Sequence, residues 1–384
     1  MKIDEFLKSA LDKKASDLHL KVGNSPIIRV DGHLVPVEAS PKLTQEDAIA
    51  LAFSIMNNQQ KQRFKERSEL DLAYSAPGLG RFRVNIFQQR GTIGLVFRVI
   101  PTKILSVEEL DLPAVVEKLA MEPRGMVLVT GTTGSGKSTT LAAMVDYINR
   151  NRTCNIITIE DPIEFLHRDR KSIVNQREIG ADTESFSVAL RSALRQDPDV
   201  VLVGEMRDFE TISTALVAAE TGHLVMSTLH TVDAVETINR IIAVFPPYQQ
   251  KQIRLQLASV IKGIISMRLV PRADGAGRVP AVEVMIATQT IRECIIDQDK
   301  TRKVHDVIAA GSTQYGMQTF DQSLYNLYLK RLIAYEEALQ WCTNPDDFAL
   351  KVKGIQSTSD VALGGGEKKG EADQGKFKIE RFSK

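Results

Sequence analysis

Hydrophobic and polar positions follow two different patterns along the chain, and the change of pattern divides it. In residues 1–100, apolar residues at helical spacing predict helices over 1–14, 47–56 and 59–67. Alternating or β-branched runs predict strands over 17–22, 27–30, 33–37, 70–74, 81–88 and 93–100. Asp31-Gly32, between two of these strands, is a hairpin signal. We therefore expect a small N-terminal α/β domain over 1–100.

After a short polar linker at 101–106, short β-branched strands alternate with longer helical segments. This order is typical of a parallel sheet covered by helices. The expected strands are 126–130, 155–159, 200–203 and 224–228. The expected helices are 138–149, 186–195, 209–220, 232–242 and 249–267. We expect this core to span 107–290, followed by a mostly helical segment over 291–351 and a disordered tail, rich in Gly, Lys and Glu, over 352–384.

The charge balance and the cysteines exclude several classes of protein. The 384 residues carry 49 Lys and Arg against 48 Asp and Glu, so the chain lacks the strongly basic balance typical of nucleic-acid-binding proteins. No apolar run approaches the ~20 residues that span a bilayer, and the N-terminus has no signal-peptide core, so we expect a cytoplasmic protein. Cys154, Cys294 and Cys342 form no CxxC pair, which argues against a disulfide framework and a zinc site.

A phosphate-binding loop is the strongest local signal. The segment 131–138 (GTTGSGKS) fits G-x-x-x-x-G-K-[ST], follows an apolar strand and precedes a helix. Its glycines let backbone N–H groups surround an anion, and the helix N-terminus adds partial positive charge. Lys137 is expected to reach the β- and γ-phosphates of ATP, and the Ser138 hydroxyl to bind Mg²⁺. The residues expected to hold the nucleotide are Gly131, Thr132, Thr133, Gly134, Ser135, Gly136, Lys137, Ser138 and Thr139.

Polar side chains follow the ends of three further predicted strands. Glu160 and Glu164 follow one strand, Glu205 follows the next, and His230 follows the last. Because ligands of an open α/β sheet bind beyond the carboxyl ends of its strands, these side chains are expected at the same edge as the P-loop. Glu160 and Glu164 are candidates for contacts to water or metal there.

Strand polarity decides between two pairs of candidates. Asp199 begins a strand and Glu205 lies past its end, six residues or ~20 Å away, so only one can lie near the γ-phosphate. We expect Glu205 to polarise the attacking water and to support Mg²⁺, and Asp199 to be a strand-entry residue. By the same argument His230 approaches the γ-phosphate, whereas His223 is structural or faces a neighbouring subunit.

Five segments beyond the P-loop carry a joint signature. They are 16–20 (SDLHL), 158–164 (TIEDPIE), 196–205 (QDPDVVLVGE), 221–230 (TGHLVMSTLH) and 316–322 (GMQTFDQ). With the P-loop they resemble the secretion ATPase superfamily, most closely the PilT-type retraction ATPases of type IV pili. The resemblance covers about residues 1–350.

This resemblance implies a PAS-like N-terminal domain joined to a RecA-like ATPase domain with a helical C-terminal segment. It implies a homohexameric Mg²⁺-dependent ATP hydrolase that retracts a type IV pilus, acting at the cytoplasmic face of the inner membrane on a platform protein, with a second retraction ATPase as a further candidate partner. ATP would lie between the two domains. Arginines of the first domain, with Arg81, Arg83 and Arg98 as candidates, would then stabilise transition-state charge. Arg195 and Arg207 are weaker candidates for contacts to the site.

Two alternatives stay open. The retraction branch carries AIRNLIRE after the core, whereas residues 290–297 read TIRECIID, which also fits a PilU-like accessory or a paralogous pilus or secretion ATPase. A RecA-like nucleic-acid motor is a distant alternative, because a fold does not fix a function.

Overall fold

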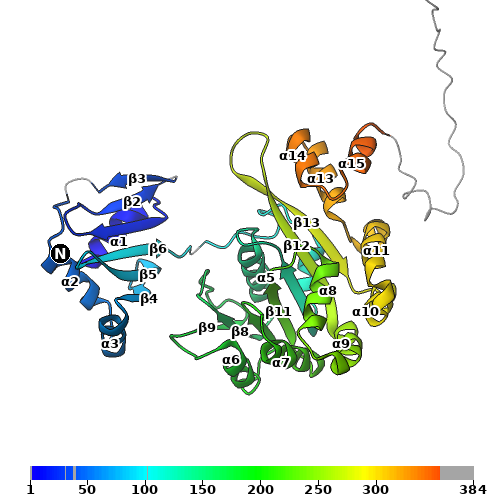
Figure 1. Cartoon of the computed structure of the whole chain (residues 1–384), viewed down its shortest axis with the longest axis horizontal. Coiled ribbons are helices and arrows are strands. Elements are labelled where there is room, and N and C mark those ends of the chain that lie inside the picture. The colour runs from blue at the N-terminus through cyan, green and yellow to red at the C-terminus, as the bar shows by residue number, and fades with distance from the viewer. Residues whose placement is uncertain (1, 31, 38–39, 102, 355–384) are drawn as a thin grey trace, which may run out of the picture.

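The computed structural model describes residues 2–30, 32–37, 40–101 and 103–354, and these residues form two lobes, each built on its own sheet (Figure 1). The expected α/β class, with an antiparallel N-terminal sheet and a RecA-like second sheet, is confirmed. Residue 102 of the expected linker and most of the expected tail, from 355 onwards, lie outside the described residues. The domain boundaries at 100, 106, 290 and 351 stay predictions.

The N-terminal lobe is a six-stranded antiparallel sheet with the order β3-β2-β1-β6-β5-β4. Its strands are β1 (Asp17–Lys21), β2 (Ile27–Val30), β3 (His33–Pro36), β4 (Glu69–Ala76), β5 (Gly80–Gln89) and β6 (Thr92–Val99). Its helices are α1 (Ile3–Asp12), α2 (Gln45–Ser54) and α3 (Asn58–Arg67). Alternate residues of β5 and β6 point to the helices, so that Phe82 and Phe97 are fully buried in one core with Leu7 of α1.

The second lobe is a seven-stranded sheet with the order β13-β12-β7-β11-β10-β8-β9, parallel except for the pair β12–β13. Its strands are β7 (Gly125–Thr130), β8 (Asn155–Glu160), β9 (Ile173–Glu178), β10 (Val200–Val203), β11 (Leu224–Leu229), β12 (Ile261–Pro271) and β13 (Arg278–Ile286). Every residue of β7, β10 and β11 is buried, because helices cover both faces of the sheet.

Helices on the two faces enclose two separate hydrophobic cores. One face packs against α4 (Val115–Ala120) and α5 (Lys137–Asn151). The other packs against α6 (Phe186–Ala193), α7 (Phe209–Glu220), α8 (Ala234–Ala243) and α9 (Pro247–Val260). The P-loop therefore lies between a buried central strand, β7, and the helix α5 of the first face.

The C-terminal segment is helical, as expected. It comprises α10 (Gln289–Ile296), a 3₁₀ helix (Gln298–Lys303), α11 (Val304–Ala310), α12 (Ser312–Tyr315), α13 (Phe320–Leu329), α14 (Tyr335–Trp341) and α15 (Pro345–Val352). Phe320 and Leu324 of α13 pack on Val279 and Ala281 of β13, so this segment is attached to the antiparallel edge of the core sheet.

One expected element is wrong in its second half. The helix expected over 249–267 ends at Val260, and 261–271 forms β12. Ile264 and Ile265 are buried on opposite faces of the sheet, and a short, continuously apolar run of this kind cannot be told from a buried helix by its periodicity. The strands β9 and β13 were not predicted.

Candidate functional site

The P-loop connects β7 to α5 in the shape of an anion cradle. Gly131 has a φ of +139°, and a Cβ there would meet the Met267 carbonyl oxygen at 2.5 Å, so only glycine fits. Lys137 Nζ donates to the carbonyl oxygens of Gly131 and Thr132, at 2.9 Å each. Ser135 Oγ is buried and finds no hydrogen-bond partner among the described residues. A polar atom left unpaired in this loop fits a site that binds a polar ligand.

Carboxylates face the P-loop lysine. Burial lowers the pKa of Lys137, while the negative charges of Glu205 and Glu164 act in the opposite direction. These two carboxylates therefore lie close enough to the Lys137 ammonium to favour its charged form. Nucleotide hydrolysis requires a cation that can bind phosphate, and it requires carboxylates close to that cation.

Glu205 and His230 meet beyond the ends of neighbouring parallel strands. Glu205 lies two residues past the end of β10, and His230 directly follows β11. His230 Nε2 lies 3.3 Å from Glu205 Oε1, and the Arg207 guanidinium donates to the same carboxylate oxygen. The Glu205 side chain is 20% exposed, so it is partly shielded and still reachable by water.

A cavity of ≈ 430 Å³ joins these groups. Its lining includes Lys137 and Ser138 of the P-loop together with predicted side chains of the other strands, namely Glu160, Glu164, Glu205 and His230. Three further lining residues, Phe165, His167 and Arg278, were not predicted. Arg278 begins β13, which the sequence pattern did not reveal, and His167 shares no spacing with another candidate.

His167 differs from His230 in its surroundings. Burial lowers the pKa of His167 to about 4, and the negative charge of Asp146 opposes this only in part. The imidazole is therefore neutral near pH 7, and its backbone N–H donates to Gln176 Oε1 at 2.9 Å. His167 contributes a neutral wall to the cavity.

The Glu160 carboxylate is held by two donors. Thr158 Oγ1 and Gln176 Nε2 lie 2.6 and 3.1 Å from Glu160 Oε1. Burial raises the pKa of Glu160, and these hydrogen bonds act against that rise. Gln176 lies on β9, a strand that the sequence pattern does not reveal, and was not predicted as a site residue.

The three candidate arginines of the N-terminal lobe do not line the cavity within the described part of the chain. Arg81 Nη2 lies 2.9 Å from Glu178 Oε2 of β9, which makes it a contact between the lobes. Arg98 Nε lies 2.9 Å from Asp17 Oδ1 within its own sheet. Arg83 is exposed and stands opposite Arg98 in the β5–β6 register. Their approach to phosphate stays a prediction.

The residues set aside by strand polarity lie at the opposite edge of the sheet. Asp199 Oδ2 accepts the backbone N–H of Asn155 at the start of β8, at 2.9 Å. His223 Nδ1 lies 2.9 Å from the Ala218 carbonyl oxygen at the end of α7. Arg195 is exposed after α6. Of the two weaker arginine candidates, Arg207 contacts the candidate site, because it donates to Glu205.

Comparison with known proteins gives extensive matches. The profile of the type II/IV secretion system protein family matches residues 1–330. The type IV pilus retractation ATPase PilT of Pseudomonas aeruginosa is 49% identical over 348 residues, which are 91% of this chain and the full length of that protein. The type IV pilus ATPase PilU of the same organism is 43% identical over 363 residues, 94% of each chain.

A solved structure shares the fold. The crystal structure of the pilus retraction motor PilT with bound ADP matches with a TM-score of 0.84 at 47% identity, covering 90% of this chain and 98% of that one. The resemblance predicted from the motifs is thus confirmed, and the chain belongs to the family of type II/IV secretion system proteins.

Proposed function

We propose that the chain is an ATP-hydrolysing motor that drives type IV pilus retraction and thereby twitching motility. The convergence of Lys137, Glu205 and His230 on one cavity carries the hydrolytic part of the proposal. The full-length match to a retraction ATPase supports the biological part. The solved relative with ADP supports nucleotide as the ligand.

The side chains divide the chemical roles. Lys137 exchanges its two carbonyl contacts for phosphate oxygens when ATP binds. Glu205 orients the attacking water and accepts its proton, and His230 holds that carboxylate in place. Glu160 and Glu164 complete the oxygen-rich wall opposite the phosphates.

Oxygen ligands around the cavity also fit Mg²⁺. The Ser138 hydroxyl and the Glu205 carboxylate are hard oxygen donors of the kind that this cation prefers. They would hold the ion together with phosphate oxygens. Bound there, Mg²⁺ supplies charge neutralisation for the phosphates.

A second cavity of ≈ 410 Å³ adjoins the P-loop at Gly136 and Thr139. Its walls include the apolar side chains of Leu105, Met267 and Leu269. A flat heteroaromatic ring fits apolar walls of this kind next to a phosphate site. We place the base of the nucleotide in this cavity.

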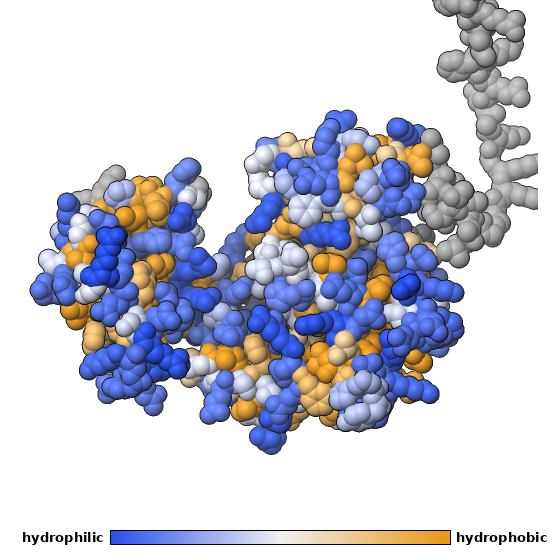
Figure 2. Space-filling model, viewed as in Figure 1, coloured by the Kyte–Doolittle hydropathy of each residue, from blue (hydrophilic) through white to orange (hydrophobic). Residues whose placement is uncertain are grey.

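We expect the chain to assemble as a homohexamer at the inner membrane, on a platform protein, with a second retraction ATPase as a further partner. Exposed apolar side chains on α6, α7 and α9 offer surface for such contacts, namely Val188, Phe209, Val217, Tyr248 and Leu255. Figure 2 shows apolar residues gathered on the second lobe where these helices lie. None of the helices in the described residues combines the length and apolar character that a bilayer crossing needs.

The test is a deletion strain of the source bacterium, complemented with the wild-type gene or with Lys137→Ala. Hyperpiliated, non-twitching cells that only the wild-type gene restores would support retraction. Cells without pili would instead indicate an assembly motor, and normal twitching would refute the proposal. Purified protein that leaves ATP intact in the presence of Mg²⁺ would refute its enzymatic part.

A PilU-like accessory motor is the second candidate. The 43% identity to PilU and the altered segment at 290–297 favour it. An accessory motor would restore retraction only in cells that retain another retraction ATPase. Complementation of a strain that lacks this gene and the gene of the other retraction ATPase therefore separates the two roles. Stimulation of hydrolysis by single-stranded DNA would point to the distant alternative, a nucleic-acid motor.

A further inference from the structure

Strand β9 carries two polar side chains, Gln176 and Glu178, on the same face of the sheet as Glu160 of the candidate site. The parallel register places Gln176 opposite Thr158 and Glu178 opposite Glu160 of β8. Alternate residues of a strand share one face of the sheet, so all four side chains lie on the same side. The edge strand β9 thus stands next to Glu160, the carboxylate that ends β8.

The Gln176 amide makes three hydrogen bonds in this position. Its Nε2 donates to Glu160 Oε1 at 3.1 Å and to the Phe165 carbonyl oxygen at 2.9 Å. Its Oε1 accepts the backbone N–H of His167 at 2.9 Å. Two acceptors on one end and one donor on the other fix the orientation of the amide. Glu160, Phe165 and His167 all line the cavity that holds the P-loop lysine.

We infer that Gln176 is a positioning residue for ATP hydrolysis: it fixes the orientation of the Glu160 carboxylate and of the cavity wall at Phe165 and His167. Thr158 Oγ1 supplies a second donor to Glu160 Oε1, so two hydrogen bonds fix this oxygen and with it the orientation of the whole carboxylate. This inference rests on the proposed function, because it assumes that the cavity hydrolyses ATP.

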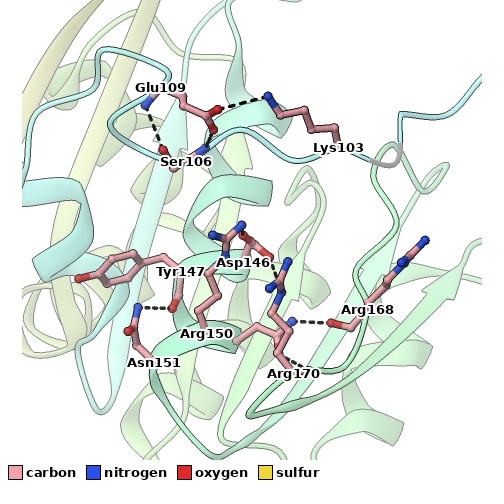
Figure 3. Close-up of polar contacts among 10 residues, drawn as sticks. Lys103, Ser106, Glu109, Asp146, Tyr147, Arg150, Asn151, Arg168 and Arg170 are labelled. Atoms are coloured by element: carbon pink, nitrogen blue, oxygen red, sulfur yellow. Dashed lines mark hydrogen bonds and ion pairs between the residues drawn. The ribbon is translucent and has the colours of Figure 1, made fainter.

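The loop that Gln176 braces is attached independently at its far end. Asn149 Nδ2 donates to the Arg168 carbonyl oxygen at 2.7 Å, and Asn149 Oδ1 accepts the Arg170 N–H at 3.0 Å. Asp146 pairs with both Arg150 and Arg170, at 2.6 and 3.5 Å (Figure 3). These contacts to α5 do not involve Gln176. Replacement of Gln176 should therefore loosen the near part of the loop and leave the fold intact.

The first experiment measures steady-state ATP hydrolysis by full-length Gln176→Met and Gln176→Glu. The methionine variant keeps the length of the side chain and removes all three hydrogen bonds. We expect kcat to fall about 10- to 100-fold, as for the loss of other residues that orient a catalytic ligand. We expect KM for ATP to stay within about threefold, because the P-loop contacts are untouched. The glutamate variant keeps the acceptor for His167 and places a second carboxylate beside Glu160, so its kcat should fall further.

Asn175→Asp is the matched control. Asn175 is the neighbouring residue on β9, it is exposed, and its amide contacts Asn155 rather than the cavity. The substitution makes the same change of amide to carboxylate one position away on the opposite face. We expect kcat and KM of this variant to equal those of the wild type.

A double-mutant cycle separates positioning from a general loss of structure. If Gln176 acts through Glu160, then Gln176→Met should change kcat less than about twofold in a Glu160→Gln background. A full additional loss in that background would overturn the inference, as would a Gln176→Met enzyme with wild-type kcat. A wild-type protein without ATPase activity would instead refute the proposed function itself.

Discussion

The contact between the lobes, Arg81 with Glu178, leads to a quantitative prediction. Glu178→Gln removes the charge of the acceptor and keeps an amide oxygen for the Ile163 N–H, which also contacts Glu178 Oε2. The Arg81 and Glu178 side chains are 21% and 7% exposed, so water screens the pair only in part. A hydrogen bond between charged groups contributes about 1.5–3 kcal/mol, and the exposure of Arg81 places this one near the lower limit.

A loss of about 1.4 kcal/mol changes an equilibrium constant tenfold. We therefore expect Glu178→Gln to shift the equilibrium between this arrangement of the lobes and more separated ones by about tenfold. Fluorescence energy transfer between dyes at the exposed positions 65 and 251, one on each lobe, measures the shift in sparsely labelled protein. Arg81→Gln and the double variant complete a thermodynamic cycle that isolates the coupling between the two side chains.

Arg98→Gln is the control, because its partner Asp17 lies in the same sheet and no contact between the lobes is lost. We expect this variant to keep the wild-type transfer efficiency. An Arg81–Glu178 coupling below about 0.3 kcal/mol would show that the pair does not stabilise this arrangement, and the reasoning would be wrong. An equal shift in Arg98→Gln would refute it as well.

Three further substitutions test the candidate site and the core around it. Lys137→Ala should abolish binding of a fluorescent ADP analogue, and binding at wild-type affinity would contradict its assigned role. Glu205→Gln should retain that binding and lower kcat by at least about 100-fold in a phosphate-release assay, whereas normal turnover would exclude it as the base. Burial raises the pKa of Glu283 to about 7, with Asp233 acting in the same direction and Arg268 against it. Its contribution to stability is therefore complete below about pH 4.5 and is lost as the pH rises through 7. In the wild type, the free energy of unfolding measured with denaturant should fall by up to about 3 kcal/mol between about pH 5 and pH 8 because of this group, and Glu283→Gln should remove that fall.

The sequence could predict the parts of the fold whose pattern is local. The alternating strands of the N-terminal lobe and the β-branched runs of 200–203 and 224–228 have nearly the bounds expected, because side-chain burial repeats with the period of the strand. The strand β12 was predicted as part of a helix, because it follows α9 without a break and both segments contain many apolar residues. The strand β9 was not predicted for the opposite reason: only its first two residues are apolar, and polar residues fill the rest of this edge strand.

The candidate site likewise contains residues that the sequence predicts and residues that it does not. Strand polarity alone placed Glu205 and His230 at one edge, and they lie 3.3 Å apart. The partners of Glu160 depend on the register between β8 and β9, which involves residues 18 positions apart and leaves no spacing to read. The pairing of Arg81 with Glu178 spans 97 positions and depends on how the two lobes meet. Such contacts follow from tertiary structure and could not be predicted from local pattern.

The two carbonyl contacts of Lys137 have a consequence for how the motor responds to fuel. Any triphosphate that enters must compete with the Gly131 and Thr132 oxygens for the same ammonium protons. The Lys137 ammonium thus already has two hydrogen-bond acceptors. Its preference among anions therefore depends on the additional contacts that several phosphoryl groups make together. We expect inorganic phosphate to gain less by this exchange than a triphosphate does, so the contacts of Lys137 with Gly131 and Thr132 should favour release of phosphate after hydrolysis.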